Sequence, residues 1–94
     1  MSPARPELRL LDRDGDADWL RLDCLAQGSS AEVVELACGA SALRRLGELG
    51  IVEGAILRVR RRAPFGGPVL VEVDGSVVAL GRGLARRVIV RMLR

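Results

Sequence analysis

The segment VLVEVDGSVVAL, residues 69–80, predicts two short strands joined by a tight turn. Side chains of an extended chain point alternately to its two faces, and every second residue in the first half of this segment is a valine: Val69, Val71 and Val73. The dipeptide formed by Asp74 and Gly75 is a strong signal of a two-residue hairpin turn. We therefore expect an antiparallel hairpin with one buried face.

The segments on both sides of this hairpin predict a mostly β domain. Residues 31–38 and 54–63 upstream, and residues 88–93 downstream, are rich in the valine, leucine and isoleucine typical of strands. With residues 68–75 and 76–83 they give five short strands. Strands this short with tight turns suit a small, strongly bent barrel, in which near closure removes free edges. The predicted fold class is mostly β with a short helix, a small five-stranded β-barrel.

Residues 41–50 predict the helix. Ser41 suits the N-cap position, and Gly50 suits the position that ends a helix. Gly47, inside the helix, costs about 1 kcal/mol relative to alanine, which suggests close packing against a strand. Leucines recur at helical spacing, at Leu43, Leu46 and Leu49.

The chain of 94 residues predicts one domain preceded by a tail. Residues 1–18 are rich in alternating charges, so we expect an acidic, flexible N-terminal tail, with the domain at residues 19–94. Residues 18–28 predict a short helix or turn, with Trp19 over the edge of the core. Because no apolar run approaches the roughly 18 residues that span a bilayer, and no signal peptide is evident, we expect a cytoplasmic protein.

Charge is distributed unevenly along the chain. Residues 1–53 contain 6 Arg and 10 acidic residues, a net charge of −4, and residues 54–94 contain 9 Arg and 2 acidic residues, a net charge of +7. The positive field of the second part favours an anionic partner. Binding of single-stranded nucleic acid needs several stacking aromatics, and the chain has one Phe and one Trp, so nucleic acid is not the expected partner.

The sequence lacks the residues of common catalytic sites. It contains no His, which excludes Ser/His/Asp and Cys/His arrangements, and no phosphate-binding fingerprint. Cys24 and Cys38 are interpreted as buried thiols, because a tetrahedral metal site needs about four ligands. The acidic run at residues 12–18 resembles a calcium loop but has Ala17 and Asp23 where an EF-hand needs Gly and Glu. We expect a binding module, not an enzyme, with no cofactor and no metal site.

The segment RRAPFGGP, residues 61–68, is the strongest candidate for a binding site. It holds the only Phe of the chain, next to glycines that permit positive φ and between prolines that restrict the backbone. Two interpretations are open: the loop folds Phe65 back to cap the end of the barrel, or Phe65 is an exposed anchor beside arginines, as at interface hot spots. The candidate partner-binding residues are Arg60, Arg61, Arg62, Pro64, Phe65, Gly66 and Gly67.

Residues 42–80 resemble the FeoA domain. The similarity combines an Arg-rich helix ending in Leu-Gly, an R-x-A-P-x-G-x-P loop, a strand ending in Ala-Leu and a final Ala…Val-x-Val, and it extends over about residues 20–94. Glu48 stands where the family often has Asp, and residues 1–18 are not part of the pattern. The matching residues are Arg44, Arg45, Leu46, Leu49, Gly50, Gly54, either Arg61 or Arg62, Ala63, Pro64, Gly66, Pro68, Ala79, Leu80, Ala85, Val88 and Val90.

The resemblance implies an SH3-like β-barrel with an inserted helix, and a role beside FeoB, the membrane ferrous-iron transporter with a GTP-binding domain. We expect a small cytoplasmic accessory protein of ferrous iron uptake that binds the cytoplasmic part of a FeoB-like transporter and modulates its GTP-driven activity. Pro64, Phe65 and the exposed helix face would make apolar contacts, and the arginines at 60–62 would steer towards an acidic partner surface or a membrane-proximal anionic region.

Other functions stay open at the level of the sequence. Similar barrels occur as the C-terminal SH3-like domain of DtxR-type metal-dependent repressors, so the chain is alternatively a free-standing regulatory domain. A small nucleic-acid-binding barrel is a further alternative. A homodimer is open as well, with strand 69–73 or strand 89–93 as the pairing edge.

Overall fold

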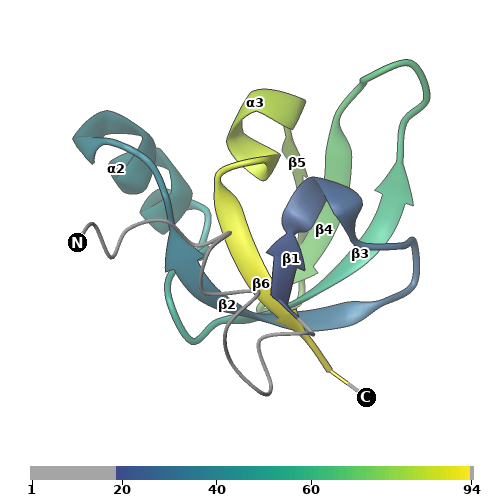
Figure 1. Cartoon of the computed structure of the whole chain (residues 1–94), viewed down its shortest axis with the longest axis horizontal. Helices are drawn as coiled ribbons and strands as arrows, with labels where there is room; N and C mark the ends of the chain where they lie inside the picture. The colour runs from purple at the N-terminus through teal and green to yellow at the C-terminus, as the bar shows by residue number, and fades with distance from the viewer. Residues whose placement is uncertain (1–18, 94) are drawn as a thin grey trace.

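The computed structural model describes residues 19–93, so the predicted tail at residues 1–18 lies outside the described residues. Residues 19–93 form one antiparallel sheet with a helix beside it and short helical turns (Figure 1). The strands lie in the order β1-β6-β2-β3-β4-β5 across the sheet. The elements are β1 (Trp19–Arg21), the 3-10 turn η2 (Leu22–Cys24), β2 (Ser30–Leu36), α2 (Ala40–Glu48), β3 (Ile56–Arg62), β4 (Val69–Val73), β5 (Ser76–Leu80), α3 (Arg82–Ala85) and β6 (Val88–Met92).

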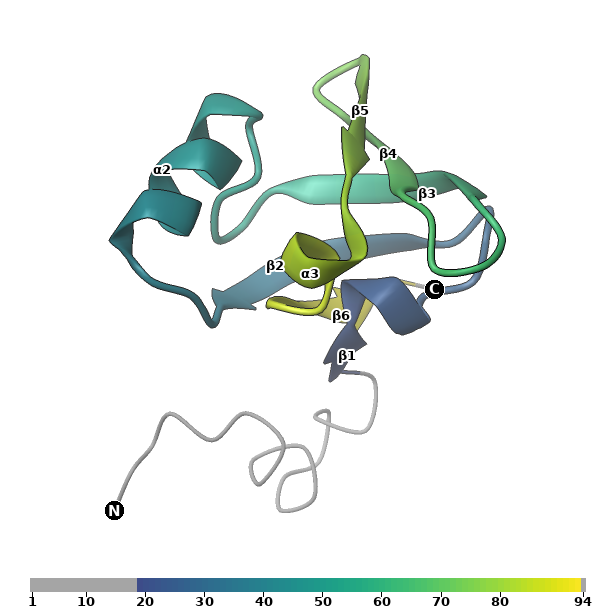
Figure 2. The ribbon, with the colours of Figure 1, turned by 90° about the horizontal axis from the view of Figure 1, so that it is seen from above.

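The sheet curls without closing. Its two edges are β1 and β5, which do not pair with each other in the described part of the chain. Figure 2 shows β5 rising steeply from the plane in which β2 and β3 lie. The mostly β fold class is confirmed, but the expected closure is not reached. The proposed pairing edges, residues 69–73 and 89–93, are wrong, because β4 lies between β3 and β5, and β6 lies between β1 and β2.

Residues 19–93 contain six strands where the sequence predicts five, because β1 is a strand. Residues 18–28 are expected to form a helix or turn, and only η2 does so. Trp19–Arg21 pairs with β6, with Trp19 opposite Arg91. A three-residue strand is too short to show alternation, so no periodic pattern marks it in the sequence.

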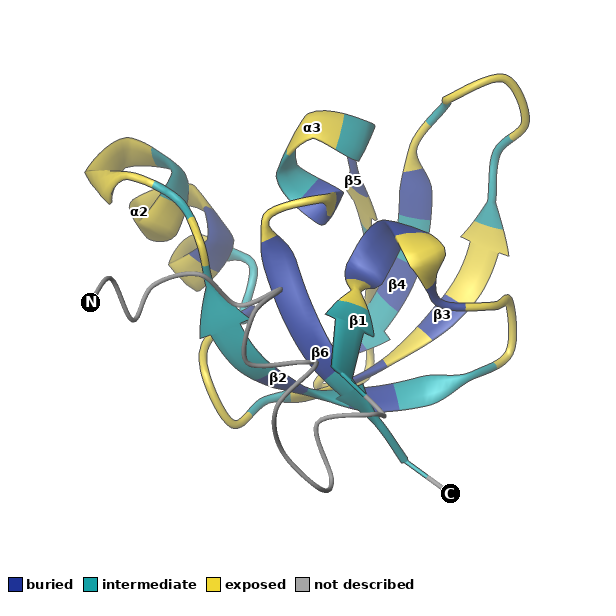
Figure 3. Ribbon diagram, in the orientation of Figure 1, coloured by how far each residue is buried: buried dark blue, intermediate teal, exposed yellow. Residues whose placement is uncertain are grey.

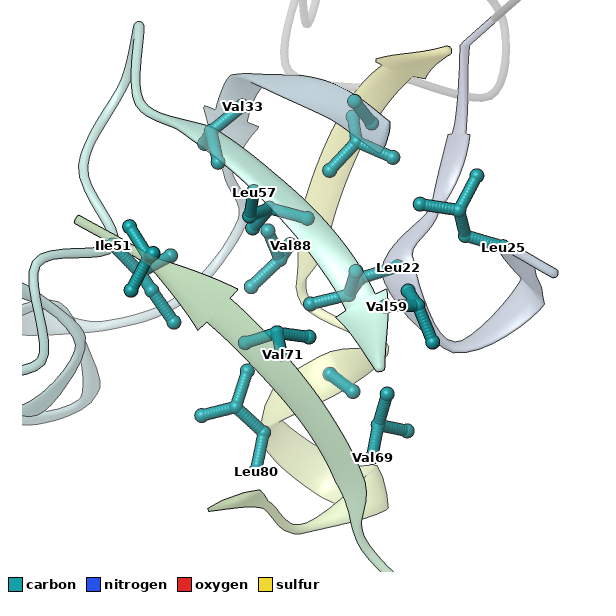
Figure 4. Packing of buried hydrophobic residues seen from close by; sticks show 14 of the residues in the cluster. Leu22, Leu25, Val33, Ile51, Leu57, Val59, Val69, Val71, Leu80 and Val88 are labelled. Carbon is teal, nitrogen blue, oxygen red and sulfur yellow. The ribbon is translucent and has the colours of Figure 1, made fainter. Parts of the chain in front are cut away.

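The core fills the space inside the curled sheet and is aliphatic (Figures 3 and 4). The alternation in β4 is confirmed, since all three of its valines are buried. Leu22 and Leu25, from η2 and the residue after it, cover the core from the other side. Full burial of an aliphatic side chain contributes about 1.5–3 kcal/mol, so a core without aromatic rings still stabilises this small sheet. Trp19 is half-buried.

Helix α2 begins two residues earlier than predicted and ends as predicted. Gly39 is its N-cap residue, so the expected cap at Ser41 is wrong, and Ser41 lies in the first turn. Gly50 has φ +85° and follows the helix, as expected. The N–H groups of Gly50 and Ile51 donate to the carbonyls of Gly47 and Leu46 at 3.0 and 2.9 Å, which forms a Schellman motif.

The close packing expected at Gly47 is not present. Apart from its chain neighbours and the backbone of its own helix, a Cβ built on Gly47 would have no heavy atom within 4 Å, because the residue faces solvent. Leu46 is the only fully buried residue of α2. Figures 1 and 2 show the helix standing to one side of the sheet, so most of its surface is free.

A β-bulge in β3 changes which arginines point outward. Val59 pairs with Val71 and Arg61 pairs with Leu70, so one extra residue, Arg60, is accommodated on β3. Beyond the bulge the alternation shifts by one position, and Arg62 comes opposite the buried Val69. Arg62 is therefore half-buried, whereas Arg61 is exposed.

No helix within residues 19–93 combines the length and the apolar character that crossing a membrane requires.

Candidate partner-binding surface

The loop between β3 and β4 is a tight, hydrogen-bonded turn. The N–H of Ala63 donates to the carbonyl of Pro68 at 3.0 Å, and the N–H of Gly67 donates to the carbonyl of Pro64 at 3.1 Å. The two residues between Pro64 and Gly67 have positive φ, 57° at Phe65 and 75° at Gly66. Positive φ at both central positions is the geometry of a type I′ turn.

Phe65 lies entirely in solvent at the tip of this turn. Its relative exposure is 102%, so the interpretation in which the ring caps the end of the barrel is wrong. A left-handed backbone costs a residue with a side chain roughly 1–2 kcal/mol, and an exposed ring gains no packing that offsets this cost. A strained, fully exposed aromatic residue on a defined turn is available to a partner at little cost in ordering.

Arg82 holds the loop in place from the start of α3. Its Nε donates to the carbonyl of Gly67 at 2.7 Å, and its Nη2 donates to the carbonyl of Ala63 at 3.0 Å. One guanidinium therefore joins both arms of the turn. The arms also approach closely, since a Cβ on Gly67 would lie 2.8 Å from the Cβ of Ala63. In Figure 1 the loop and α3 lie at the same end of the molecule, at the top of the view.

The three consecutive arginines of β3 have three different environments. Arg60 forms an exposed ion pair with Glu72, with 2.9 Å between Nη1 and Oε1. Arg61 is exposed and has no hydrogen bond or ion pair within residues 19–93. Arg62 turns towards the core, where its Nη2 donates to the carbonyl of Asp23 at 2.6 Å. Among the three, Arg61 is the cation free to meet a partner.

The contact with Asp23 ties the loop to η2. Asp23 is buried, and its carboxylate lies 3.0 Å from Nε of Arg21. A hydrogen bond to the Cys24 sulfur and the charge of Asp23 raise the pKa of Arg21. The Nε of Arg62 is buried and has no hydrogen-bond partner within residues 19–93.

Of the seven candidate residues, the structure brings five together at the exposed tip and directs two elsewhere. Arg82 and Asp23 also shape this surface, and the sequence does not single them out. Arg82 lies between Gly81 and Gly83, a sequence too short to indicate a function, and Asp23 contributes a backbone carbonyl, which any residue type has. The tip residues are Arg61, Pro64, Phe65, Gly66 and Gly67.

The cysteines do not form a metal site in the described part of the chain. Cys24 is exposed and Cys38 is half-buried, and both thiols are free, so the interpretation as buried thiols is wrong for Cys24. Residues 19–93 contain no group of three or more His, Cys, Asp and Glu side chains that could hold a metal ion.

A small, curled antiparallel sheet with a short helix is the architecture of an SH3-like fold. In this chain the loops of that fold expose apolar and cationic side chains. The sequence pattern of the FeoA domain matches residues 20–92, and the chain belongs to the FeoA family. The resemblance seen in the sequence and the fold class are both confirmed.

Relatives and solved structures support this assignment. A protein of Methanocaldococcus jannaschii named "Putative Fe(2+) transport protein A" is 38% identical over 64 residues, 68% of this chain and 76% of that protein. A crystal structure titled iron uptake regulatory protein (FeoA) has a TM-score of 0.76 and 35% identity, and the match covers 80% of this chain and 99% of that chain. The solution structure of FeoA from Chlorobium tepidum has a TM-score of 0.74 and 37% identity, over 80% of this chain and 71% of that chain.

The fold is also shared with part of a transcriptional repressor. A manganese-dependent transcriptional repressor has a TM-score of 0.74 and 28% identity, and the match covers 80% of this chain and 42% of the repressor.

Proposed function

We propose that this protein is a cytoplasmic accessory protein of ferrous iron uptake that binds the cytoplasmic part of a FeoB-like transporter and modulates its GTP-driven activity. Membership of the FeoA family supports the link to iron transport. The observation that supports the binding mode is Phe65, the most exposed large apolar side chain of residues 19–93. Aromatic and arginine side chains are enriched at interface hot spots.

The tip surface has the properties of an anchor. Phe65 supplies an apolar ring that a pocket on the transporter can bury, and the turn fixes its backbone before the encounter. Arg82 keeps the turn from opening, so little conformational entropy is lost on binding. Non-enzymatic action follows from this role, because the transporter supplies the GTP-binding site.

Charge supports approach to an acidic surface. Arg61 lies next to the turn, and Arg86 and Arg87 are exposed at the end of α3, the element that holds the loop. Exposed charges of one sign accelerate association with an oppositely charged surface and do so less at high salt. The acidic partner surface proposed here therefore predicts a salt-dependent association rate.

Calorimetric titration tests this function. The protein is titrated against the soluble GTP-binding domain of FeoB from its own organism, and then against the full-length transporter in detergent, while GTP hydrolysis is followed in the same samples. We expect binding to at least one form and a changed hydrolysis rate. Phe65→Ala should weaken binding at least roughly tenfold, as for a hot-spot side chain.

Ile56→Ala is the matched control. Ile56 is an exposed apolar residue at the other end of β3, with a relative exposure of 53%. Its replacement should leave affinity unchanged. Absence of binding to both transporter forms would contradict the proposed function. Equal losses in both variants would contradict the assigned surface.

A regulatory domain of the repressor type is the second candidate, favoured by the fold shared with the manganese-dependent repressor. It predicts binding to a transcriptional repressor's other domains rather than to the transporter. The titration above separates the two, because only the first candidate binds the GTP-binding domain or the full-length transporter.

A further inference from the structure

Within residues 19–93, β5 is an edge strand, and its sequence lacks the features that protect most edge strands. Native sheets protect their edges with charged residues, prolines, bulges or very short strands. The strand Ser76–Leu80 contains no charge, no Pro and no Gly, and it pairs with β4 over its whole length without a bulge. The other edge, β1, is three residues long and includes Arg21.

The hairpin fixes which backbone groups of β5 are free. The two-residue turn at Asp74 and Gly75 has φ of 52° and 79°, as in a type I′ hairpin, so the flanking pair of Val73 and Ser76 is a hydrogen-bonded pair. Hydrogen-bonded and non-hydrogen-bonded pairs alternate along an antiparallel ladder. The N–H and C=O groups of Val77 and Ala79 therefore point away from β4, towards the open edge.

We propose that β5 is a homodimerisation edge, at which two copies of the chain pair their β5 strands antiparallel to form one continuous sheet. In one register, every outward-pointing N–H and C=O group of the strand forms a hydrogen bond with the second copy. When Val78 lies on the two-fold axis, Val77 is opposite Ala79 of the second copy, and the two such pairs form four hydrogen bonds between the chains. A shift of two residues leaves only one hydrogen-bonded pair, so the other outward N–H and C=O groups of the strand have no partner.

The same register suits the side chains. Val77 and Ala79 are exposed on one face and would pack against each other across the interface. On the other face Val78 is half-buried against the core and would meet Val78 of the second copy. Non-hydrogen-bonded pairs have the closer Cα atoms, about 4.5 Å apart, so this contact would extend the core between the two copies.

This dimer does not depend on the proposed function, because no transporter residue takes part in it.

Cysteine cross-linking tests the register. In a Cys24→Ser, Cys38→Ala background, Val78→Cys should form an intermolecular disulfide under mild oxidation. Its Cβ would face the Cβ of residue 78 in the second copy across the two-fold axis. Val77→Cys alone and Ala79→Cys alone should cross-link at least roughly tenfold more slowly, and a mixture of the two should form a mixed dimer. Equal rates for Val77→Cys and Val78→Cys would overturn the register.

Sedimentation analysis of the wild-type chain tests the dimer itself. We expect a concentration-dependent monomer–dimer equilibrium. Ala79→Pro removes an outward N–H while sparing the β4 ladder, and should raise the dimer dissociation constant roughly tenfold or more. Val77→Lys and Ile56→Lys form a matched pair, since both positions have a relative exposure of 53%. Only the edge lysine should weaken the dimer.

Circular dichroism on each variant verifies that it remains folded, and Val77→Lys keeps the test valid if Ala79→Pro does not fold. A chain that stays monomeric up to about 1 mM would overturn the proposal, as would a dimer that neither edge variant weakens. A dimer weakened equally by Ile56→Lys would overturn the assignment to β5.

Discussion

At the scale of single residues, the loop tip depends on a backbone conformation that phenylalanine does not favour. Phe65 and Asp74 are the two non-glycine residues of 19–93 with positive φ. Asp tolerates the left-handed region because its short polar side chain bonds locally, whereas Phe does not. The exposed ring is therefore held at a cost to stability, as is common at binding sites.

Replacing Phe65 with glycine should stabilise the fold and weaken partner binding at once. Phe65→Gly relieves the left-handed strain, so we expect the free energy of unfolding in urea to rise by about 1 kcal/mol. Asp74→Gly is the control and should give a smaller gain. A loss of stability in Phe65→Gly would show that the ring packs against the protein in solution.

The neighbouring arginines should separate into a binding residue and a structural residue. Arg62→Ala removes the hydrogen bond to the carbonyl of Asp23 and should lower the free energy of unfolding by about 1–3 kcal/mol. Arg61→Ala should leave stability within about 0.5 kcal/mol of wild type and slow association with the transporter at low salt. Urea unfolding and stopped-flow association measure the two effects. Equal loss of stability in both variants would contradict the inward orientation of Arg62.

At the scale of elements, strict alternation predicts strands well and fails at bulges. Val69, Val71 and Val73 are buried as the pattern requires. The bulge at Arg60 shifts the alternation by one position, so Arg62 turns towards the core, although the sequence predicts that all three arginines bind the partner. Nothing in a run of three arginines indicates which of them is the extra residue. Helix α2 shows the same limit, since its end is predicted from Gly50 but its N-cap is Gly39 rather than a polar residue.

Two glycines should respond in opposite ways to the same substitution. Gly47 lies in α2 with open space around it, so Gly47→Ala should raise the free energy of unfolding by about 0.5–1 kcal/mol through helix propensity. Gly67→Ala should lower it, because the new Cβ would lie 2.8 Å from the Cβ of Ala63. Thermal and urea unfolding of both variants are the measurement. A destabilising Gly47→Ala would mean that the helix packs against another surface in solution.

At the scale of the whole molecule, the sequence predicts the fold class and the loop, and misses how they are joined. The apolar patterns, the Asp-Gly turn and the family resemblance identify a mostly β, SH3-like domain. The three-residue β1, the open seam between β1 and β5 and the contact of Arg82 with the loop are long-range features. Pairings between distant segments depend on packing rather than on local propensity, so single-sequence patterns do not contain them.

Backbone amide NMR of the labelled protein during titration with the FeoB GTP-binding domain, or with the full-length transporter in detergent where the isolated domain does not bind, is the most direct test of the proposed surface. We predict that the amides of Phe65, Gly66 and Gly67 shift or broaden first, together with those of α3, while those of Ile56 and β2 stay unchanged. Binding with perturbations confined to β2 or α2, and an unchanged loop, would contradict the role of Phe65. An unchanged spectrum with both transporter forms would contradict the transporter as partner.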